Sequence, residues 1–315
     1  MQTYQEFHTL NEALITFGKG GGKPKFGHIV FLAGGAAAGK GLVTSHMLGI
    51  EGKVLNVDNI KDYFIKSAKL RAQVKSEYGI DISPEAFPLS NPRNTGMLHS
   101  IIAADKHIPK HADITLFKSI ATADEERKPN LIIDTTMQNT VKISNITYAA
   151  IEAGYQKENI HMVWVCAPYH LSKELNLDRG EQGGRSVDDD VLWGTHHGAA
   201  TTLKAFIYGE VNRYVKPLSK YMDGDMWIVF NQPNIDMTLT TSEPKPNTVF
   251  PSRKLSGGAF IAKGVNYIKI KSQGSPVEKP NQDLVDKIAS YVPYDRNGGW
   301  KKMATRPRRE YHELK

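Results

Sequence analysis

The chain has 315 residues, of which 40% are apolar and 23% are charged, so it can bury a large core in one or two domains. No apolar run reaches the roughly 18 residues that a membrane-spanning helix needs, so we expect no contact with a membrane. The formal net charge of +7 favours polyanionic partners such as nucleotides and nucleic acids, although many ordinary enzymes are as basic.

Predicted strands and helices alternate along the chain, and this alternation is typical of the α/β class with a parallel sheet. The predicted strands are residues 28–33, 54–57, 131–133, 161–167 and 226–230, and the predicted helices are residues 4–17, 42–49, 59–80 and 140–153. We therefore predict a three-layer sandwich around a five-stranded, mostly parallel sheet.

The remaining segments are predicted to be linkers, loops and an extension. Gly18–Gly22 is a flexible linker by composition, and the stretch rich in Pro, Asn and Ser at residues 82–96 is a predicted loop over the site. Residues 240–258 are a similar loop, residues 258–272 alternate like a strand or hairpin, and basic and aromatic residues from Arg296 onward form a predicted basic arm. The expected division is an N-terminal helix and linker over 1–27, a core over 28–235 with a lid around 170–200, and a C-terminal extension over 236–315.

The single cysteine, Cys166, lies in an apolar run and is predicted to be a buried small hydrophobe. One cysteine cannot form an internal disulfide, and the first residues show no basic segment followed by an apolar one, so no secretory signal is expected. We predict a reducing location, which is the cytoplasm (the host cytoplasm for a viral protein).

Residues 34–41 read Gly-Gly-Ala-Ala-Ala-Gly-Lys-Gly and match the spacing G-x-x-x-x-G-K, directly after a predicted strand and before a predicted helix. Small side chains let the backbone curl so that successive N–H groups face phosphate oxygens, while the helix presents the positive end of its dipole. Lys40 adds a point charge for the outer phosphates. The predicted nucleotide-binding residues are Gly34, Gly35, Ala36, Ala37, Ala38, Gly39, Lys40 and Gly41.

Gly41 stands where such loops usually carry a Ser or Thr, whose hydroxyl binds Mg²⁺. In this respect the loop resembles that of adenylate-kinase-like enzymes, which also carry Gly-Lys-Gly. We therefore expect the metal to be held by waters and by other groups.

Asp58 and Asp134 each follow a predicted strand and should lie at the edge of the sheet where ligands bind. Asp58 is the candidate base that accepts the proton of the acceptor hydroxyl, and Asp134 is the candidate ligand of Mg²⁺, directly or through water. The alternative for both residues is a turn former or a helix cap after a strand.

The glycine-rich stretch with Arg179 and Arg185 after the fourth strand is predicted to be a mobile cationic lid over the triphosphate. Either arginine would stabilise charge on the transferred group, and the alternative is a surface loop with solvated arginines. Farther along, Asp188–Asp190 are predicted to cap a helix and His196 and His197 to be ordinary histidines, with a metal site as the alternative.

Together these residues resemble the zeta-toxin and polynucleotide-kinase-like group of P-loop kinases. The resemblance rests on the loop at residues 34–41, the strand ending at Asp58, the Ile132–Thr136 strand, and the strand that leads through Pro168 to Arg179 and Gly184-Arg185. It covers roughly residues 28–235 and implies ATP or GTP with Mg²⁺, Lys40 on the phosphates, Asp58 as base, and Arg179 and Arg185 on the transferred charge.

The resemblance leaves the acceptor open. The first hypothesis is a kinase that acts on a hydroxyl of a nucleic acid, with 5-hydroxymethyluracil in phage DNA as an example of such an acceptor. The second hypothesis keeps the chemistry but changes the acceptor to a nucleotide-sugar, as in a toxin. The third hypothesis, supported by Gly41, is a nucleotide-binding module without catalysis.

Overall fold

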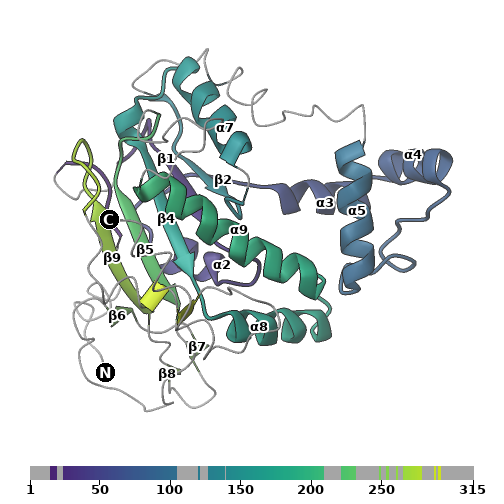
Figure 1. The fold of residues 1–315 in the computed structure, drawn as a ribbon. Coiled ribbons are helices and arrows are strands. Elements are labelled where there is room, and N and C mark those ends of the chain that lie inside the picture. The colour runs from purple at the N-terminus through teal and green to yellow at the C-terminus, as the bar shows by residue number, and fades with distance from the viewer. Residues whose placement is uncertain are drawn as a thin grey trace.

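A seven-stranded sheet lies at the centre of the part of the chain that the structure, a computed structural model, describes (Figure 1). The strand order is β2-β3-β1-β4-β5-β9-β6, in which the first five strands are parallel and β9 and β6 are antiparallel to their neighbours. The described residues are 15–19, 24–104, 120, 127–138, 140–208, 221–231, 248–249, 253–254, 260–261, 265–278, 287–288 and 290–291.

The five predicted strands are confirmed, and two further strands join them in the sheet, one of which lies in the stretch predicted to be a strand or hairpin. The strands of the sheet are β1 Ile29–Ala33, β2 Lys53–Asn56, β3 Leu131–Asp134, β4 Ile160–Cys166, β5 Met226–Asn231, β6 Thr248–Val249 and β9 Val265–Lys271. A separate pair consists of β7 Arg253–Lys254 and β8 Phe260–Ile261. The alternating pattern predicted over 258–272 therefore contains β8 and β9, and β9 extends the central sheet beside β5.

The helices depart from the prediction in three places. The helices of the described residues are α2 Lys40–His46, α3 Val57–Lys66, α4 Ala68–Tyr78, α5 Pro92–Ala104, α7 Thr140–Glu152, α8 Tyr169–Glu181 and α9 Asp189–Tyr208, with a short 3₁₀ turn at Lys157–Asn159. The single helix predicted over 59–80 is broken at Ser67, whose Oγ accepts a hydrogen bond from the N–H of Leu70 and caps α4. The loop predicted over 82–96 ends early, because α5 begins at Pro92.

Pro92 starts α5 for a local reason. Asn91 precedes it and accepts a hydrogen bond from the N–H of Arg93 on its side-chain oxygen, so Asn91 supplies the cap. Proline in the first position of a helix loses no hydrogen bond, because that N–H has no partner inside the helix. The third departure lies in the predicted lid around 170–200, where no helix was predicted but α8 ends at Glu181 and α9 begins at Asp189.

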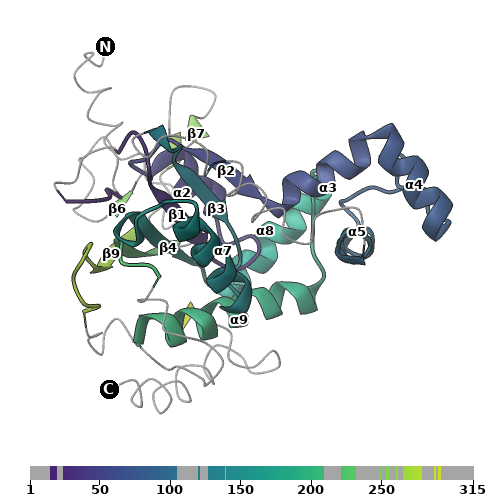
Figure 2. The ribbon, with the colours of Figure 1, turned by 90° about the horizontal axis from the view of Figure 1, so that it is seen from above.

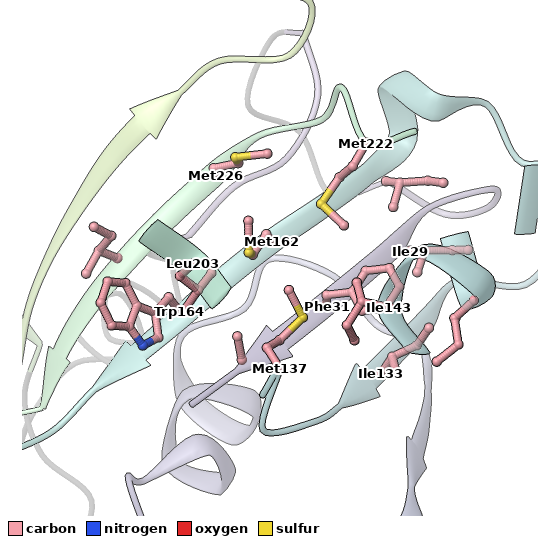
Figure 3. Packing of buried hydrophobic residues seen from close by; sticks show 14 of the residues in the cluster. Ile29, Phe31, Ile133, Met137, Ile143, Met162, Trp164, Leu203, Met222 and Met226 are labelled. Atoms are coloured by element: carbon pink, nitrogen blue, oxygen red, sulfur yellow. The ribbon is translucent and has the colours of Figure 1, made fainter. Parts of the chain in front are cut away.

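The two faces of the sheet are covered by different elements, which confirms the predicted three layers. Along β1, Ile29 and Phe31 belong to one apolar cluster and Val30 and Leu32 to the other, as the pleat of a strand requires. Helices α7 and α9 pack on the first face, with Leu203 of α9 over β4 (Figure 3). On the second face, α2 packs together with the N-terminal segment around residues 15–17.

Helices α3, α4 and α5 form a small unit of their own. They project sideways from the sheet in both views (Figures 1 and 2). Phe64, Val74 and Leu98, one from each of the three helices, share a separate apolar cluster. Helix α3 begins directly after β2, so this unit is attached at the carboxyl edge of the sheet.

A buried polar cluster, which we call the His161 cluster, lies at the opposite edge of the sheet. It consists of His28, His161, Asp225 and Lys269, at the amino ends of β1, β4 and β5 and near the end of β9. His161 Nδ1 accepts the backbone N–H of Asp225 at 2.9 Å, so the proton of the ring is on Nε2, which donates to His28 Nδ1 at 2.8 Å. The 3.7 Å approach of His161 to the Asp225 carboxylate is therefore not an ion pair, and Asp225 pairs with Lys269 at 2.7 Å instead.

Several of the predicted segments lie outside the described residues. These are most of the helix predicted over 4–17, most of the Gly18–Gly22 linker, most of the 240–258 loop, and the basic arm from Arg296. None of the helices within the described ranges is long and apolar enough to cross a bilayer.

Candidate functional site

The phosphate loop predicted at residues 34–41 joins β1 to α2 and has an unusual backbone. Ala37 has a φ of 55° and Gly39 a φ of 92°, and both values lie in the left-handed region. A side chain on Gly39 would also meet Asn231 Nδ2 at 2.3 Å, so only glycine fits there. Helix α2 begins at Lys40 with no described side chain capping it, as in helices whose first amides bind an anion.

Lys40 folds back over its own loop. Its ammonium donates to Gly34 O at 2.9 Å and to Gly35 O at 3.2 Å, and it lies 3.6 Å from Asp134 Oδ1. The other carboxylate oxygen of Asp134 accepts from Asn56 Nδ2 at 2.7 Å. The structure thus brings together Lys40 and Asp134, the residues predicted for the phosphates and for the metal.

Three side chains from distant elements bind the backbone of the phosphate loop, and we call them the loop frame: Thr195 and His196 on α9, and Asn231 at the end of β5. Ala36 N–H donates to Thr195 Oγ1 at 3.0 Å, and Ala36 O accepts from His196 Nε2 at 2.8 Å. Asn231 Nδ2 donates to Ala38 O at 2.8 Å. All three frame side chains are buried. The oxygen of the Asn231 amide is buried and has no hydrogen-bond partner among the described residues.

His196 is a neutral imidazole in the folded protein. Its Nε2 must carry the proton, because a carbonyl oxygen can only accept a hydrogen bond. Burial lowers the pKa of His196 to about 4, against the partial opposing effect of the hydrogen bond to Ala36. Burial and the neighbouring His28 lower the pKa of His161 in the same direction.

The folded protein is expected to lose stability in mild acid for this reason. The unfolded chain binds a proton at each of these histidines below about pH 6.5, whereas folded His196 does so only near pH 4. Stability should therefore be fully present above pH 6.5 and fall as the pH drops, with His196 alone contributing about 2 kcal/mol of the loss at pH 5. Urea denaturation at pH 7.5 and pH 5 measures this loss, and the same midpoint at both pH values would contradict it.

The hydroxyl that usually binds Mg²⁺ after the lysine of such a loop is missing here, and no neighbouring side chain in the described part of α2 replaces it. A side chain at Gly41 would meet nothing within 4 Å, so space for the usual hydroxyl exists although the hydroxyl does not. Thr44 does not replace it, since its hydroxyl donates to Lys40 O at 3.1 Å within α2. The single carboxylate of Asp134 could hold Mg²⁺, because Mg²⁺ in phosphate sites usually binds one or two carboxylates and takes its other ligands from waters and the phosphates. The residues present therefore fit Mg²⁺.

Asp58 lies in the first turn of α3, directly beyond β2. The predicted strand over 54–57 is one residue too long, because β2 ends at Asn56, and Asp58 is a helical residue. Asn56 pairs in register with Asp134 of the neighbouring strand β3. Asp58 lies two residues after Asn56, and therefore close beyond the same edge of the sheet.

The predicted lid arginines lie at and after the end of α8. Arg179 is exposed in the last turn of α8. Arg185 forms an ion pair with Asp62 of α3 at 3.3 Å. Asp62 lies one helical turn after Asp58 on the same helix. Ser186 then donates to the backbone oxygen of Ser90, so the connection between α8 and α9 is attached to the α3–α5 unit.

The acidic run before α9 caps that helix, as predicted. Asp188 Oδ1 accepts from the N–H of Asp190 at 2.8 Å, and α9 begins at Asp189. His197 stacks on Trp193, one turn earlier on the same helix, with the ring centroids 4.9 Å apart. Over the described part of the chain, no three His, Cys, Asp or Glu side chains are placed to hold a metal, so the alternative of a histidine metal site has no support there. Cys166 is buried as predicted, and burial raises the pKa of its thiol.

Sequence reasoning missed the loop frame. Thr195, His196 and Asn231 bind residues about 160 to 190 positions away, and no local pattern marks them. The available signal was indirect: Asn231 ends an apolar strand at the same edge of the sheet as Asp134, where polar residues gather in parallel sheets.

The chain resembles known proteins in one family and in several solved structures. Residues 110–216 match the family model for zeta toxin, and this match includes Asp134, α8 and α9 and leaves out the phosphate loop. A search of curated proteins gives no match. One similar solved structure belongs to the PezAT chromosomal toxin–antitoxin system of Streptococcus pneumoniae, with 11% identity, a TM-score of 0.40, and coverage of 98% of this chain and 93% of that chain. Another is AvrRxo1-ORF1:-ORF2 with ATP, with 13% identity, a TM-score of 0.41, and coverage of 89% and 67%.

Proposed function

We propose that this zeta-toxin-like chain is a P-loop kinase that transfers the terminal phosphate of ATP or GTP to a hydroxyl group. The observation that carries the proposal is the curled backbone of residues 34–41, with Lys40 folded over it and Asp134 beside it. The family match over residues 110–216 supports the same class independently, because it lies outside the loop.

Lys40 would exchange one set of oxygens for another when the nucleotide binds. Its ammonium donates to two loop carbonyls, and phosphate oxygens carry far more negative charge than carbonyls do. The amides of the loop and the first turn of α2 would bind the same phosphates. Bound Mg²⁺, held through Asp134 and waters, would neutralise charge on the outer phosphates.

Asp58 is the proposed base. The acceptor hydroxyl oxygen forms a bond to the terminal phosphorus as the bond to the bridging oxygen breaks, and the nucleoside diphosphate leaves with that electron pair. The hydroxyl proton passes to the Asp58 carboxylate. Arg179 and Arg185 are the proposed donors to the transferred charge, and the contact between Arg185 and Asp62 supports Arg185 more strongly, because Asp62 shares a helix with Asp58.

For the acceptor we propose a hydroxyl of a nucleic acid, with 5-hydroxymethyluracil in DNA as one example. The net charge of +7 supports this class. The alternative acceptor is a nucleotide-sugar, which the match to the zeta toxin family favours. A nucleotide-binding module without catalysis is the remaining alternative, and the absent hydroxyl at Gly41 is its support.

An acceptor screen tests both the kinase activity and the proposed class of acceptor. Purified protein, Mg²⁺ and ATP or GTP labelled in the terminal phosphate are incubated with hydroxymethylated duplex DNA, unmodified DNA, 5′-hydroxyl oligonucleotides and nucleotide-sugars. We expect label on a nucleic acid. Label on nucleotide-sugars alone would contradict the nucleic-acid acceptor but keep the kinase, whereas nucleotide binding with no labelled product would favour the binding module.

Asp58→Asn is the matched variant for that screen, because it keeps the shape of the side chain and removes its basicity. Transfer should fall by about 10²–10⁴-fold, which is the usual contribution of a general base. Asp81→Asn, which neutralises a surface carboxylate paired with Lys75, is the control and should retain far more activity. Equal rates in wild type and Asp58→Asn would remove Asp58 from the role of base.

A further inference from the structure

We infer that the loop frame, Thr195, His196 and Asn231, fixes the peptide orientations of the phosphate loop, so that the amides of Ala37 and Gly39 can face the bound phosphates and these three are positioning residues for the nucleotide. This inference rests on the proposed function, since it concerns the same loop. It assigns a task to three side chains that contact the backbone of the loop from outside.

The planarity of the peptide bond connects each outer contact to an inner amide. In a trans peptide, the C=O of one residue and the N–H of the next point in opposite directions. His196 holds the C=O of Ala36, so the N–H of Ala37 points away from α9. Asn231 likewise holds the C=O of Ala38, so the N–H of Gly39 points away from the end of β5.

Thr195 fixes the preceding peptide, between Gly35 and Ala36, in the opposite orientation, with its N–H rather than its C=O toward α9. The C=O of Gly35 accepts from Lys40, and the N–H of Ala36 points the other way, toward Thr195 Oγ1. The Ala36 amide is therefore committed to α9 and is not one of those available to a phosphate. Successive peptides thus alternate: the carbonyl of Gly35 faces the Lys40 side, and the carbonyl of Ala36 faces α9.

The frame is rigid enough for such a task. Leu192, Ala199 and Leu203 of α9 are buried, and Thr195 Oγ1 also donates to Leu192 O at 2.9 Å, which fixes the direction of its proton. A side chain on Gly35 would meet the His196 ring at 2.3 Å, so helix and loop are in direct contact. Donors that are already aimed before the ligand binds cost no reorganisation when it does.

Pairs of conservative variants separate this role from simple packing. At position 196, Gln places an amide N–H near the position of Nε2, while Asn places it near that of Nδ1 and leaves Ala36 O without its donor. At position 195, Ser keeps the hydroxyl and Val removes it at nearly constant volume. Asn231→Leu removes the donor to Ala38 O. Melting temperature is recorded for every variant.

The measurement is calorimetric titration with a non-hydrolysable ATP analogue, together with the KM values for ATP and for the acceptor. We expect His196→Asn, Thr195→Val and Asn231→Leu to weaken analogue binding about fivefold to tenfold, as the loss of one buried hydrogen bond would. The KM for ATP should rise equally, while the KM for the acceptor stays unchanged. His196→Gln and Thr195→Ser should bind within about twofold of wild type, since each keeps its hydrogen bond.

Failure of the inference and failure of the proposed function give different results. If the wild type does not bind the analogue, the proposed function is wrong. If the wild type binds and folded His196→Asn and Thr195→Val bind equally well, the frame does not orient the loop. If affinity follows melting temperature alone, with no difference between Gln and Asn or between Ser and Val, the frame is structural and the inference is overturned.

Discussion

Lys40→Ala is expected to lower phosphate transfer by about 10²–10³-fold while the protein stays folded. The ammonium lies 3.6 Å from Asp134 and donates to two carbonyls of the loop, so it is held at the proposed phosphate site. Without it, the triphosphate beside the Asp134 carboxylate would lose one of the positive charges that offset it, and bound Mg²⁺ would have to compensate. Initial rates of transfer at saturating acceptor measure the loss.

The control for Lys40→Ala is Lys157→Ala. Lys157 is half exposed beside Glu158, just before β4, and therefore lies at the edge of the sheet opposite the phosphate loop. The Lys157→Ala substitution removes the same charge from the chain without touching the loop, so the rate of phosphate transfer should stay within about twofold of wild type. A Lys40→Ala enzyme with wild-type rates would refute the reading of residues 34–41 as a phosphate loop.

Asp225→Ala is expected to cost about 3 kcal/mol of the free energy of unfolding. The Asp225 side chain is almost fully buried, and its carboxylate accepts from Gly18 N at 2.7 Å, from Gln273 N at 3.0 Å and from Lys269 Nζ at 2.7 Å. Alanine would leave two backbone donors without a partner. Lys269 can turn to water, because about a third of its side chain is exposed, and this keeps the cost below that of a fully buried pair.

Urea denaturation at pH 7.5 measures that loss as a shift of the midpoint at constant slope. Asp81→Ala is the matched control, since Asp81 pairs with Lys75 on the surface at 3.6 Å and its loss should shift the midpoint far less than the loss of Asp225. Folded Asp225→Ala should still bind nucleotide, because the His161 cluster and the phosphate loop lie at opposite edges of the sheet. Equal midpoints for the two variants would show that the His161 cluster contributes no more than a surface pair.

The sequence predicted the parallel strands well because their patterns are local. The strand before the phosphate loop and the strand ending at Asp134 are short apolar runs bounded by turn residues, and both are confirmed. The phosphate loop was recognisable for the same reason, since its spacing, strand and helix are contiguous in the chain. The start of α5 was missed, although Asn91 and Pro92 form a helix-start signal within the stretch that was predicted to be a loop.

The contacts across the chain could not be read in this way. Asn231 and Ala38 are far apart in sequence, and their hydrogen bond exists only because β5 and the loop meet at one edge of the sheet. Similarly, β9 alternates like many surface strands, and nothing in its residues specifies β5 as its partner. The ion pair that joins Arg185 to α3 depends on how the connection between α8 and α9 meets the α3–α5 unit, which local patterns do not encode.

The antiparallel pairing of β9 with β5 bears on how the protein could be shortened. A fragment ending at residue 235, the predicted end of the core, would retain β5 but lose the strand that covers its outer side. The backbone of β5 would then offer a row of unsatisfied donors and acceptors beside apolar side chains such as Ile228 and Phe230, which favours self-association between copies. The residues of β9, beyond 235, thus cover an edge of the parallel strands that would otherwise favour self-association.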